Sequence, residues 1–347
     1  MSPETVRTRP RRRVRLLVFA GAFVALLGSA VAVPMVANAG VGSSHCGVPV
    51  YGAIEDKYGE LGAENGPLGC PTNEESDAAR GGRWQAFQSG FVFWHPALGA
   101  HAVYGSIATK WSELGRENGV LGYPVTDETG TPDGVGRYNH FEFNGSIYWT
   151  PSTGAHAVYG AIRDKWQALG WERGVLGYPL SDEATTIDGT AQYNDFQGGA
   201  INWTSTAGAH LSRIEFSWVP SLSNITGSEH LTLYQNGGYL FSGSFHDDSC
   251  CFTYDVGLID AVRTPQGKAF VFSETGTVHG TRDPRSSTHS WNTSGQNTAL
   301  AAEWMALDQS FTENANATRS SALGGLWSDV QSAIGPVSKI ISVVGSL

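Results

Sequence analysis

The sequence predicts an α+β protein in which three repeats, each a short helix, a Gly-x-Pro turn and an aromatic β-hairpin, form an arc or ring and precede an antiparallel β sandwich or barrel with C-terminal helices. A block close to VYGAIxDKWxxLGxxxGVLGYP occurs three times, beginning at Val50, Val103 and Val158. Within each copy, a helical spacing of apolar residues gives way to a period of two. After about Arg213 the chain shows mainly strand-like alternation. Because repeats of roughly 50 residues bury their apolar faces against neighbours, the copies are expected to stack.

The first half of each copy predicts a short amphipathic helix. In the second copy, Ile107, Trp111 and Leu114 lie at i, i+4 and i+7 and therefore share one helix face. Gly115 follows directly, where a glycine in the left-handed conformation commonly ends a helix. A Gly-x-Pro turn comes next, since Gly tolerates unusual backbone angles and Pro fixes φ. The equivalent residues in the other copies are Ile54, Tyr58, Leu61 and Gly62, and Ile162, Trp166, Leu169 and Gly170.

The second half of each copy predicts a strand entered through a glycine turn. Ile147 and Trp149 share one strand face, and Tyr148 between them points to the other. A face with Val or Ile followed by Trp recurs in each copy, so we expect it to be core. We expect the other face to be exposed and to contact a ligand through Tyr148 and its counterparts Phe93 and Asn202.

A histidine closes each copy in a Gly-Ala-His element, at His101, His156 and His210. Two interpretations fit this recurrence. The three imidazoles line a ligand-binding face, or each makes the same hydrogen bond within its own repeat. Both remain open at this point.

A glutamate recurs just past the Gly-x-Pro turn, at Glu75, Glu128 and Glu183. These carboxylates could pair as an acid and a base or bind a cation. Their position directly after a turn instead predicts a solvated capping role.

The N-terminal segment has the organisation of a secretory signal peptide. Six arginines precede an apolar run from Leu16 to about Val36, and Ala37-Asn38-Ala39 provides a cleavage site. The alternative is a retained membrane anchor, because the run is just long enough to span a bilayer. Removing residues 1–39 would change the formal net charge from −10 to −15, so nucleic acid is not an expected partner.

Four cysteines in an exported chain predict disulfides. Cys46 precedes the first copy, and Cys70 replaces the tyrosine found at its position in the other copies. Both occur only in the first copy, so we expect a Cys46–Cys70 bridge that stabilises a terminal repeat. The adjacent Cys250 and Cys251 could form a vicinal disulfide, pair with another chain or remain thiols.

The repeated block resembles the LGFP repeat, named for a Leu-Gly-Phe-Pro turn. That turn reads Leu-Gly-Cys-Pro at 68–71 and Leu-Gly-Tyr-Pro at 121–124 and 176–179, and the resemblance covers about residues 50–212. It implies a secreted, cell-wall-associated protein, because LGFP repeats occur in exported proteins of mycolic-acid-containing actinobacteria and are thought to hold their host to the wall. The implied partner is a cell-wall glycan or another envelope polymer, with membrane contact only through an uncleaved signal segment.

Beyond residue 212 the sequence predicts about six strands, with Asn236-Gly237 favouring a tight hairpin. Asn297 is expected to cap a helix, and Gly335-Pro336 to break a second apolar-striped segment. The stretch 312–321, rich in Ser, Asn and Thr, separates the two helical segments. The expected organisation is a signal peptide 1–39, a linker 40–49, repeats 50–102, 103–157 and 158–212, a β-rich module 213–296 and a C-terminal helical region 297–347.

No catalytic motif is recognisable, since both the G-x-S-x-G and the H-E-x-x-H patterns are absent. Cys250 with His246 and Asp247 could form a thiol nucleophile and its base. A metal site could also form from histidines of the C-terminal half with Asp247 or Asp260, the histidines being His230, His246, His279 and His289. The preferred prediction has no catalytic residue, metal or cofactor. The alternatives are a wall-active hydrolase or acyltransferase in the C-terminal module and a surface adhesion protein.

Overall fold

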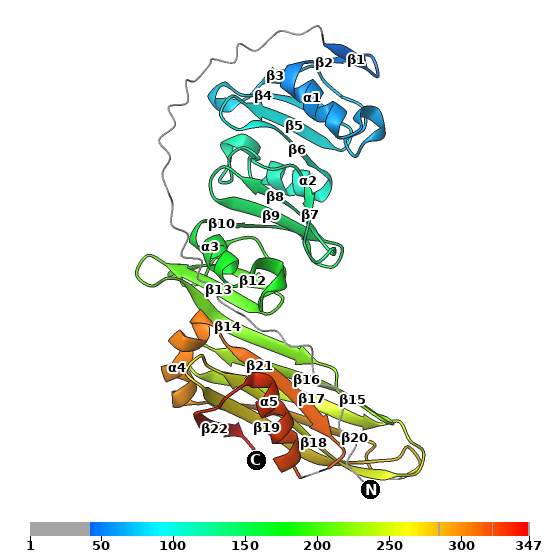
Figure 1. The fold of residues 1–347 in the computed structure, drawn as a ribbon, viewed down its shortest axis with the longest axis vertical. Coiled ribbons are helices and arrows are strands. Elements are labelled where there is room, and N and C mark those ends of the chain that lie inside the picture. The colour runs from blue at the N-terminus through cyan, green and yellow to red at the C-terminus, as the bar shows by residue number, and fades with distance from the viewer. Residues whose placement is uncertain (1–41, 284, 321, 346–347) are drawn as a thin grey trace. The chain divides into compact units, whose positions relative to one another are not determined.

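A computed structural model describes residues 42–283, 285–320 and 322–345 (Figure 1). These residues form two compact units. The repeat unit extends to Gln167 and includes Tyr178–Asp195, whereas the C-terminal unit contains Ala168–Gly177 and the chain from Phe196 onward. The predicted signal peptide lies outside the described residues. Within the described ranges, no helix is both long and apolar enough to cross a membrane.

Each copy folds as a helix, a 3-10 turn and short antiparallel strands (Figure 1). The second copy has the sheet order β10-β9-β8-β7. Its elements are α2 (Gly105–Glu113), η3 (Arg116–Asn118), β7 (Thr129–Gly130), β8 (Arg137–Phe141), β9 (Gly145–Thr150) and β10 (Gly154–Tyr159). The first copy has the equivalent order β3-β4-β5-β6 and is preceded by the β1–β2 hairpin. Its elements are β1 (Ser43–His45), β2 (Val48–Val50), α1 (Gly52–Glu60), η1 (Ala63–Asn65), β3 (Ser76–Asp77), η2 (Ala79–Gly81), β4 (Arg83–Phe87), β5 (Gly90–His95) and β6 (Gly99–Tyr104).

The third copy repeats the same element order. The pairs β11 with β12 and β13 with β14 are antiparallel. Its elements are α3 (Gly160–Ala168), η4 (Trp171–Arg173), β11 (Ala184–Thr185), β12 (Gln192–Phe196), β13 (Gly199–Thr204) and β14 (Gly208–Trp218), the last of which continues into the C-terminal unit.

The predicted helix and its glycine stop are confirmed. In the second copy α2 buries Ile107 and Trp111, and Gly115 follows with φ 89° and ψ 15°, in the left-handed region. The helix also holds the Gly-x-Pro turn, because the indole Nε1 of Trp111 donates to the carbonyl of Gly122 at 3.1 Å. Gly122 has φ 72°, a conformation that favours glycine over residues with a Cβ. The motif therefore positions a turn against its own helix.

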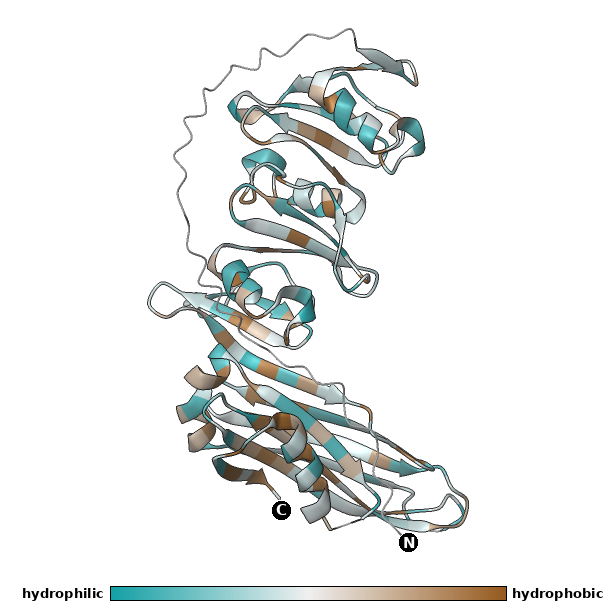
Figure 2. Ribbon diagram, in the orientation of Figure 1, coloured by the Kyte–Doolittle hydropathy of each residue, from teal (hydrophilic) through white to brown (hydrophobic). Residues whose placement is uncertain are grey.

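The hydrophobic cores are shared between neighbouring copies. One buried cluster combines Phe93 of the first copy with Ile107, Trp111 and other residues of the second. Figure 2 shows the hydrophobic residues as bands within β5 and β9. A single copy cannot complete such a core, which is the expected behaviour of stacked repeats.

The C-terminal unit contains two sheets. Strands β13-β14-β16-β17-β20 lie in one sheet, where β15 pairs with β16, and β21-β18-β19-β22 form the other. Phe272 of β19 packs against Tyr239 and Phe241 of β17, with ring centroids 5.7 and 5.8 Å apart. Among the described strands no closed barrel forms. The bounds are β15 (Ser221–Leu222), β16 (Ile225–Tyr234), β17 (Gly238–Asp247), β18 (Thr253–Arg263), β19 (Lys268–His279), β20 (Thr288–Gln296), α4 (Thr298–Gln309), β21 (Thr312–Thr318), α5 (Gly324–Ile334) and β22 (Lys339–Val344).

The C-terminal region is less helical than predicted. The Asn297 cap is confirmed, because its side chain accepts from the backbone N–H groups of Ala299 and Leu300, and α5 ends before Gly335. However, residues 312–318 form the buried strand β21, and β22 pairs in parallel with β19. The strand β21 buries asparagine side chains alongside alanines, so its sequence does not show an apolar strand pattern.

Candidate functional site

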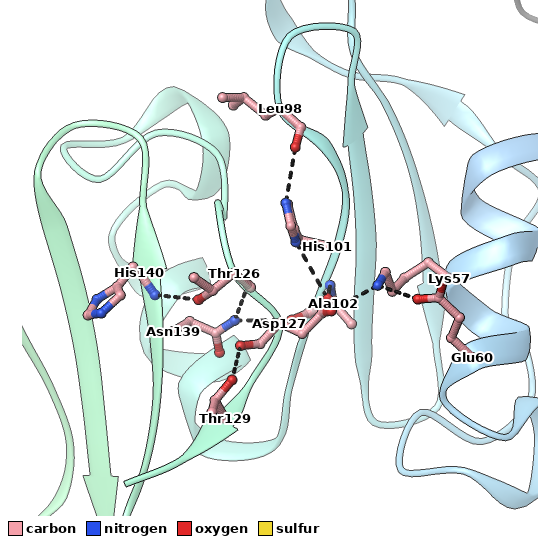
Figure 3. Close-up of polar contacts among 10 residues, drawn as sticks. All are labelled: Lys57, Glu60, Leu98, His101, Ala102, Thr126, Asp127, Thr129, Asn139 and His140. Carbon is pink, nitrogen blue, oxygen red and sulfur yellow. Dashed lines mark hydrogen bonds and ion pairs between the residues drawn. The ribbon is translucent and has the colours of Figure 1, made fainter. Parts of the chain in front are cut away.

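The junction between the first and second copies is built around Asp127 (Figure 3). Its carboxylate lies 2.8 Å from Lys57 Nζ of α1 and accepts the backbone N–H of Ala102 at 2.9 Å. His101 Nδ1 lies 3.6 Å from the same carboxylate, while its Nε2 lies 3.1 Å from the carbonyl of Leu98. Burial would raise the pKa of Asp127, but the contacts with His101, Lys57 and the Ala102 amide outweigh it and hold this pKa well below its usual range. Asp127 is therefore an ionised link between copies.

An asparagine completes the same junction. Asn139 Nδ2 donates to the carbonyl of Ala102 at 3.1 Å and to that of Thr126 at 2.8 Å. Both polar groups of the Ala102 peptide position are thus bound by side chains of the next copy (Figure 3). These bonds fix the approach of the two copies, because buried backbone groups require partners.

The junction between the second and third copies, also within the repeat unit, has the same set of contacts. Asp182 lies 2.8 Å from Lys110 Nζ and accepts the N–H of Ala157 at 2.8 Å. Asn194 Nδ2 donates to the carbonyl of Ala157 at 3.1 Å, and His156 Nδ1 lies 3.7 Å from Asp182. This recurrence identifies the Lys, His, Asp and Asn set as an element of the repeat.

The C-terminal unit provides a similar pair of bonds for the third copy. Asp308 of α4 accepts the N–H of Leu211 at 2.6 Å, and Trp304 Nε1 donates to the carbonyl of Leu211 at 2.7 Å. Leu211 occupies the position of Ala102 and Ala157. Helix α4 therefore substitutes for the side chains that a following copy would supply. Sequence reasoning missed this role, because neither residue lies in a repeat.

The aromatic strand face predicted to be exposed is buried. Phe93 is 1% and Tyr148 3% accessible, so the expectation that they face solvent is wrong. The helix of the next copy covers each ring: Phe93 lies 4.8 Å from Trp111, and Tyr148 lies 4.7 Å from Trp166. Asn202, their counterpart, is half-buried and accepts a hydrogen bond from Ser212 at 3.0 Å. The ligand-contact prediction depended on exposure of this face, and Phe93 and Tyr148 do not have that exposure.

The repeated histidines divide into two groups. His101 and His156 make the same pair of contacts, to a carbonyl three residues earlier and to the aspartate of the next copy. His210 differs, because its Nδ1 lies 3.1 Å from the carbonyl of Gly208. The interpretation of one bond per repeat fits the first two histidines and not the third.

The tyrosine of the Leu-Gly-Tyr-Pro turn also contacts the preceding copy. Tyr123 donates to the carbonyl of Ala79, and Tyr178 OH lies 2.7 Å from Asp133 Oδ1. In the first copy this position is Cys70, which forms the predicted disulfide with Cys46. A residue that would otherwise contact an earlier copy is thus used to secure the β1–β2 hairpin.

The prediction that the recurring glutamates are solvated caps is wrong. The Glu128 side chain is 6% exposed and pairs with Arg137, and Glu75 pairs with Arg83 at 2.6 Å. In the third copy a glutamine replaces this arginine. Burial raises the pKa of Glu183 to about 6, although a hydrogen bond with Tyr159 opposes the shift.

The cysteine considered as a nucleophile is engaged in a disulfide. Cys250 and Cys251 form a disulfide with each other, which leaves no thiol at this position in the structure. The histidines considered for a metal have separate partners, namely Ser217 for His230, Thr288 for His246, Thr253 for His279 and Glu274 for His289. Within the part of the chain that the structure describes, no group of three or more metal-ligating side chains occurs.

Comparison with known families agrees with this repeat geometry. The LGFP repeat family matches residues 68–119, 121–174 and 176–216, each match beginning at the Leu-Gly-x-Pro turn. This part of the chain therefore consists of three LGFP repeats. Comparison with curated proteins gives no match.

Proposed function

We propose that this protein is exported and binds a cell-envelope polymer, a wall glycan, through its LGFP repeats without acting as an enzyme. The observation that carries the proposal is the match of three successive repeats to a family associated with wall-facing proteins. The repeated junctions support it, because they join neighbouring copies in the same way, and stacked repeats commonly present a continuous surface to a ligand. The disulfides fit an oxidising compartment outside the cytosol.

Charge and chemistry favour this proposal over the alternatives. The formal net charge of −10 disfavours polyanionic partners such as nucleic acid. A thiol-dependent hydrolase would need a thiolate, whereas Cys250 is bonded to Cys251. The C-terminal unit instead provides the partners of Leu211 in the third copy, a structural contribution to the repeats.

Sedimentation with isolated wall sacculi tests the proposal. The purified full chain should pellet saturably with delipidated sacculi and should be displaced by soluble glycan released from them. An unrelated acidic secreted protein, treated identically, controls for trapping. A chain that stays in the supernatant with both delipidated and lipid-bearing sacculi would refute polymer binding. Release of soluble sugars or peptides from the sacculi during incubation would instead support the hydrolase alternative.

A further inference from the structure

An open groove of about 770 Å³ lies between the β4–β5 turn of the first copy and helix α2 of the second. Its floor includes Phe91 and the buried Ala108, and its rim carries exposed hydroxyl groups. The hydroxyl-bearing residues are Ser89, Ser106, Thr109 and Ser112. All of these residues belong to the repeat unit.

The equivalent position between the second and third copies is filled by an arginine. Arg163 stands where the second copy has Ala108. Its Nε donates to Ser146 Oγ at 2.6 Å and its Nη1 to Asn144 Oδ1 at 2.7 Å. Ser146 and Asn144 are the counterparts of Phe91 and Ser89. Polar side chains therefore bridge this position at the junction of the second and third copies, whereas the groove occupies it at the junction of the first and second.

The rim of the groove presents hydrogen-bond acceptors. Thr109 Oγ1 donates to the carbonyl of Gly105 at 3.3 Å, and Ser112 Oγ donates to the carbonyl of Ala108 at 2.8 Å. Because these hydroxyl protons are engaged within the helix, the oxygen lone pairs remain to accept from ligand hydroxyl groups. The polar groups thus suit a ligand rich in O–H donors.

The aromatic ring in the groove floor is fixed in position, and the groove lining carries little net charge. The Phe91 ring lies 6.0 Å from Trp84 and 6.2 Å from Phe93, which hold it in place. Glu113, the carboxylate of the lining, pairs with Lys110 at 2.7 Å. The Arg116 guanidinium lies 5.6 Å from the centre of the Phe91 ring but is not part of the groove lining. Within the lining, an apolar ring with a few convergent polar groups and one paired carboxylate matches a neutral, hydroxylated ligand better than a phosphate or nucleic acid.

We infer that this groove is a binding subsite for a neutral glycan segment. The inference rests on the proposed wall binding and assigns it to the junction of the first and second copies. A sugar ring would stack on Phe91 while its hydroxyl groups donate to the rim. Ala108 is the residue that keeps the subsite open.

The test fills the groove with the three side chains that bridge the junction of the second and third copies. The triple variant S89N/F91S/A108R should fold, because the chain already contains this combination at Asn144, Ser146 and Arg163. It should lose at least tenfold in affinity for neutral, peptide-free oligosaccharides from delipidated sacculi, measured by titration calorimetry on the full chain. R163A is the matched control, which alters the closed junction and should keep the wild-type affinity.

A second variant protects the test against misfolding. T109V/S112A removes two rim hydroxyls without filling the groove, and should weaken oligosaccharide binding severalfold. Unchanged oligosaccharide affinity in either folded variant would contradict the glycan subsite. Wild-type protein that pellets with sacculi but does not bind the oligosaccharides would contradict it as well. Neither result would contradict wall binding. Failure of the wild type to bind sacculi and oligosaccharides alike overturns the proposed function as well.

Discussion

Among the described residues, Glu183 has no arginine partner of the kind that Glu75 and Glu128 have. Arg137 pairs with Glu128 in the second copy and also donates to Tyr104 at 2.9 Å. In the third copy Gln192 takes the arginine position, and Glu183 contacts Tyr159 instead. Burial makes the ionised form of Glu183 costly, which is the physical cause of its raised pKa, and the Tyr159 hydrogen bond offsets this only in part.

Replacing Glu183 with Gln should stabilise the protein near neutral pH. The pKa is about 6 in the folded state and about 4.3 in an unfolded chain, so folding favours the protonated form. That contribution is complete below about pH 4 and is lost as the pH rises through about 6. Urea unfolding should therefore show E183Q more stable than wild type by about 1–2 kcal/mol at pH 7.5, with the difference vanishing near pH 4.

In the comparison variant E128Q the same burial raises the pKa of the glutamate, but Arg137 opposes the shift, so its gain in stability at pH 7.5 should be smaller than that of E183Q. An E183Q advantage that stays constant from pH 4 to 8 would show that the effect does not arise from ionisation.

The chemistry of single residues was only partly readable from the sequence. The Cys46–Cys70 pairing was predicted correctly, because both cysteines occur only in the first copy. The burial of Glu128 was missed, since its arginine partner lies nine residues later on another strand. Local position after a turn does not reveal such a partner.

At the scale of elements, α4 takes a role that the repeats perform elsewhere. Asp127 and Asp182 come from the loop after a Gly-x-Pro turn, whereas Asp308 comes from a helix. Each accepts the N–H at the same position of a β-hairpin strand. Unrelated secondary structure thus satisfies the same backbone requirement.

Removing the Asp308 carboxylate should destabilise the end of the third copy. D308A leaves the buried N–H of Leu211 without its acceptor, which should lower the free energy of unfolding by about 1–3 kcal/mol. Amide exchange at Leu211 should accelerate in parallel. D308N keeps an oxygen acceptor and should cost much less.

A surface control comes from the same helix. Met305 is 65% exposed, so M305A should change stability by less than about 0.5 kcal/mol. Equal stability of D308A and M305A would mean that α4 does not support the third copy.

The elements themselves were predictable where the pattern is local. The helix spacing, the left-handed glycine and the turn depend on neighbouring residues, and all three were found. The face expected to be core does bury Ile147, although Trp149 on the same face is only half-buried. The opposite face was assigned incorrectly, because Phe93 and Tyr148 become core only when the next helix stacks on them. Strand β21 was missed for a related reason, since its buried asparagines acquire their environment from the sheet.

At the scale of the whole molecule, the first copy differs from the others in how it begins. Pro49 stands at the position of Ala102 and has no N–H to donate. Gln85 Nε2 still donates to the Pro49 carbonyl at 3.0 Å, and the disulfide ties Cys70 to the preceding hairpin. Covalent linkage thus replaces contacts that an earlier copy would make.

Removing this disulfide should lower global stability. The bridge joins cysteines 24 residues apart, and closing such a loop restricts the unfolded chain by about 3 kcal/mol. C46S/C70S should therefore unfold at lower denaturant concentration by that free energy, measured by intrinsic fluorescence. The Cys250–Cys251 disulfide closes almost no loop, so C250S/C251S should lose far less unfolding free energy. Identical unfolding curves for C46S/C70S and wild type would remove the bridge from the account of stability.

At each junction a backbone N–H of one copy binds an aspartate of the next copy, as Ala102 does with Asp127 and Ala157 with Asp182. Pro49 has no such N–H to donate, and Asp308, which is not part of a repeat, provides the acceptor for Leu211. A duplicated copy would therefore fit between existing copies, because it would carry both the donor N–H and the acceptor aspartate that its neighbours require. Adding one beyond either terminus would require redesign of Pro49 or of α4, so changes in copy number are expected to arise by insertion within the series.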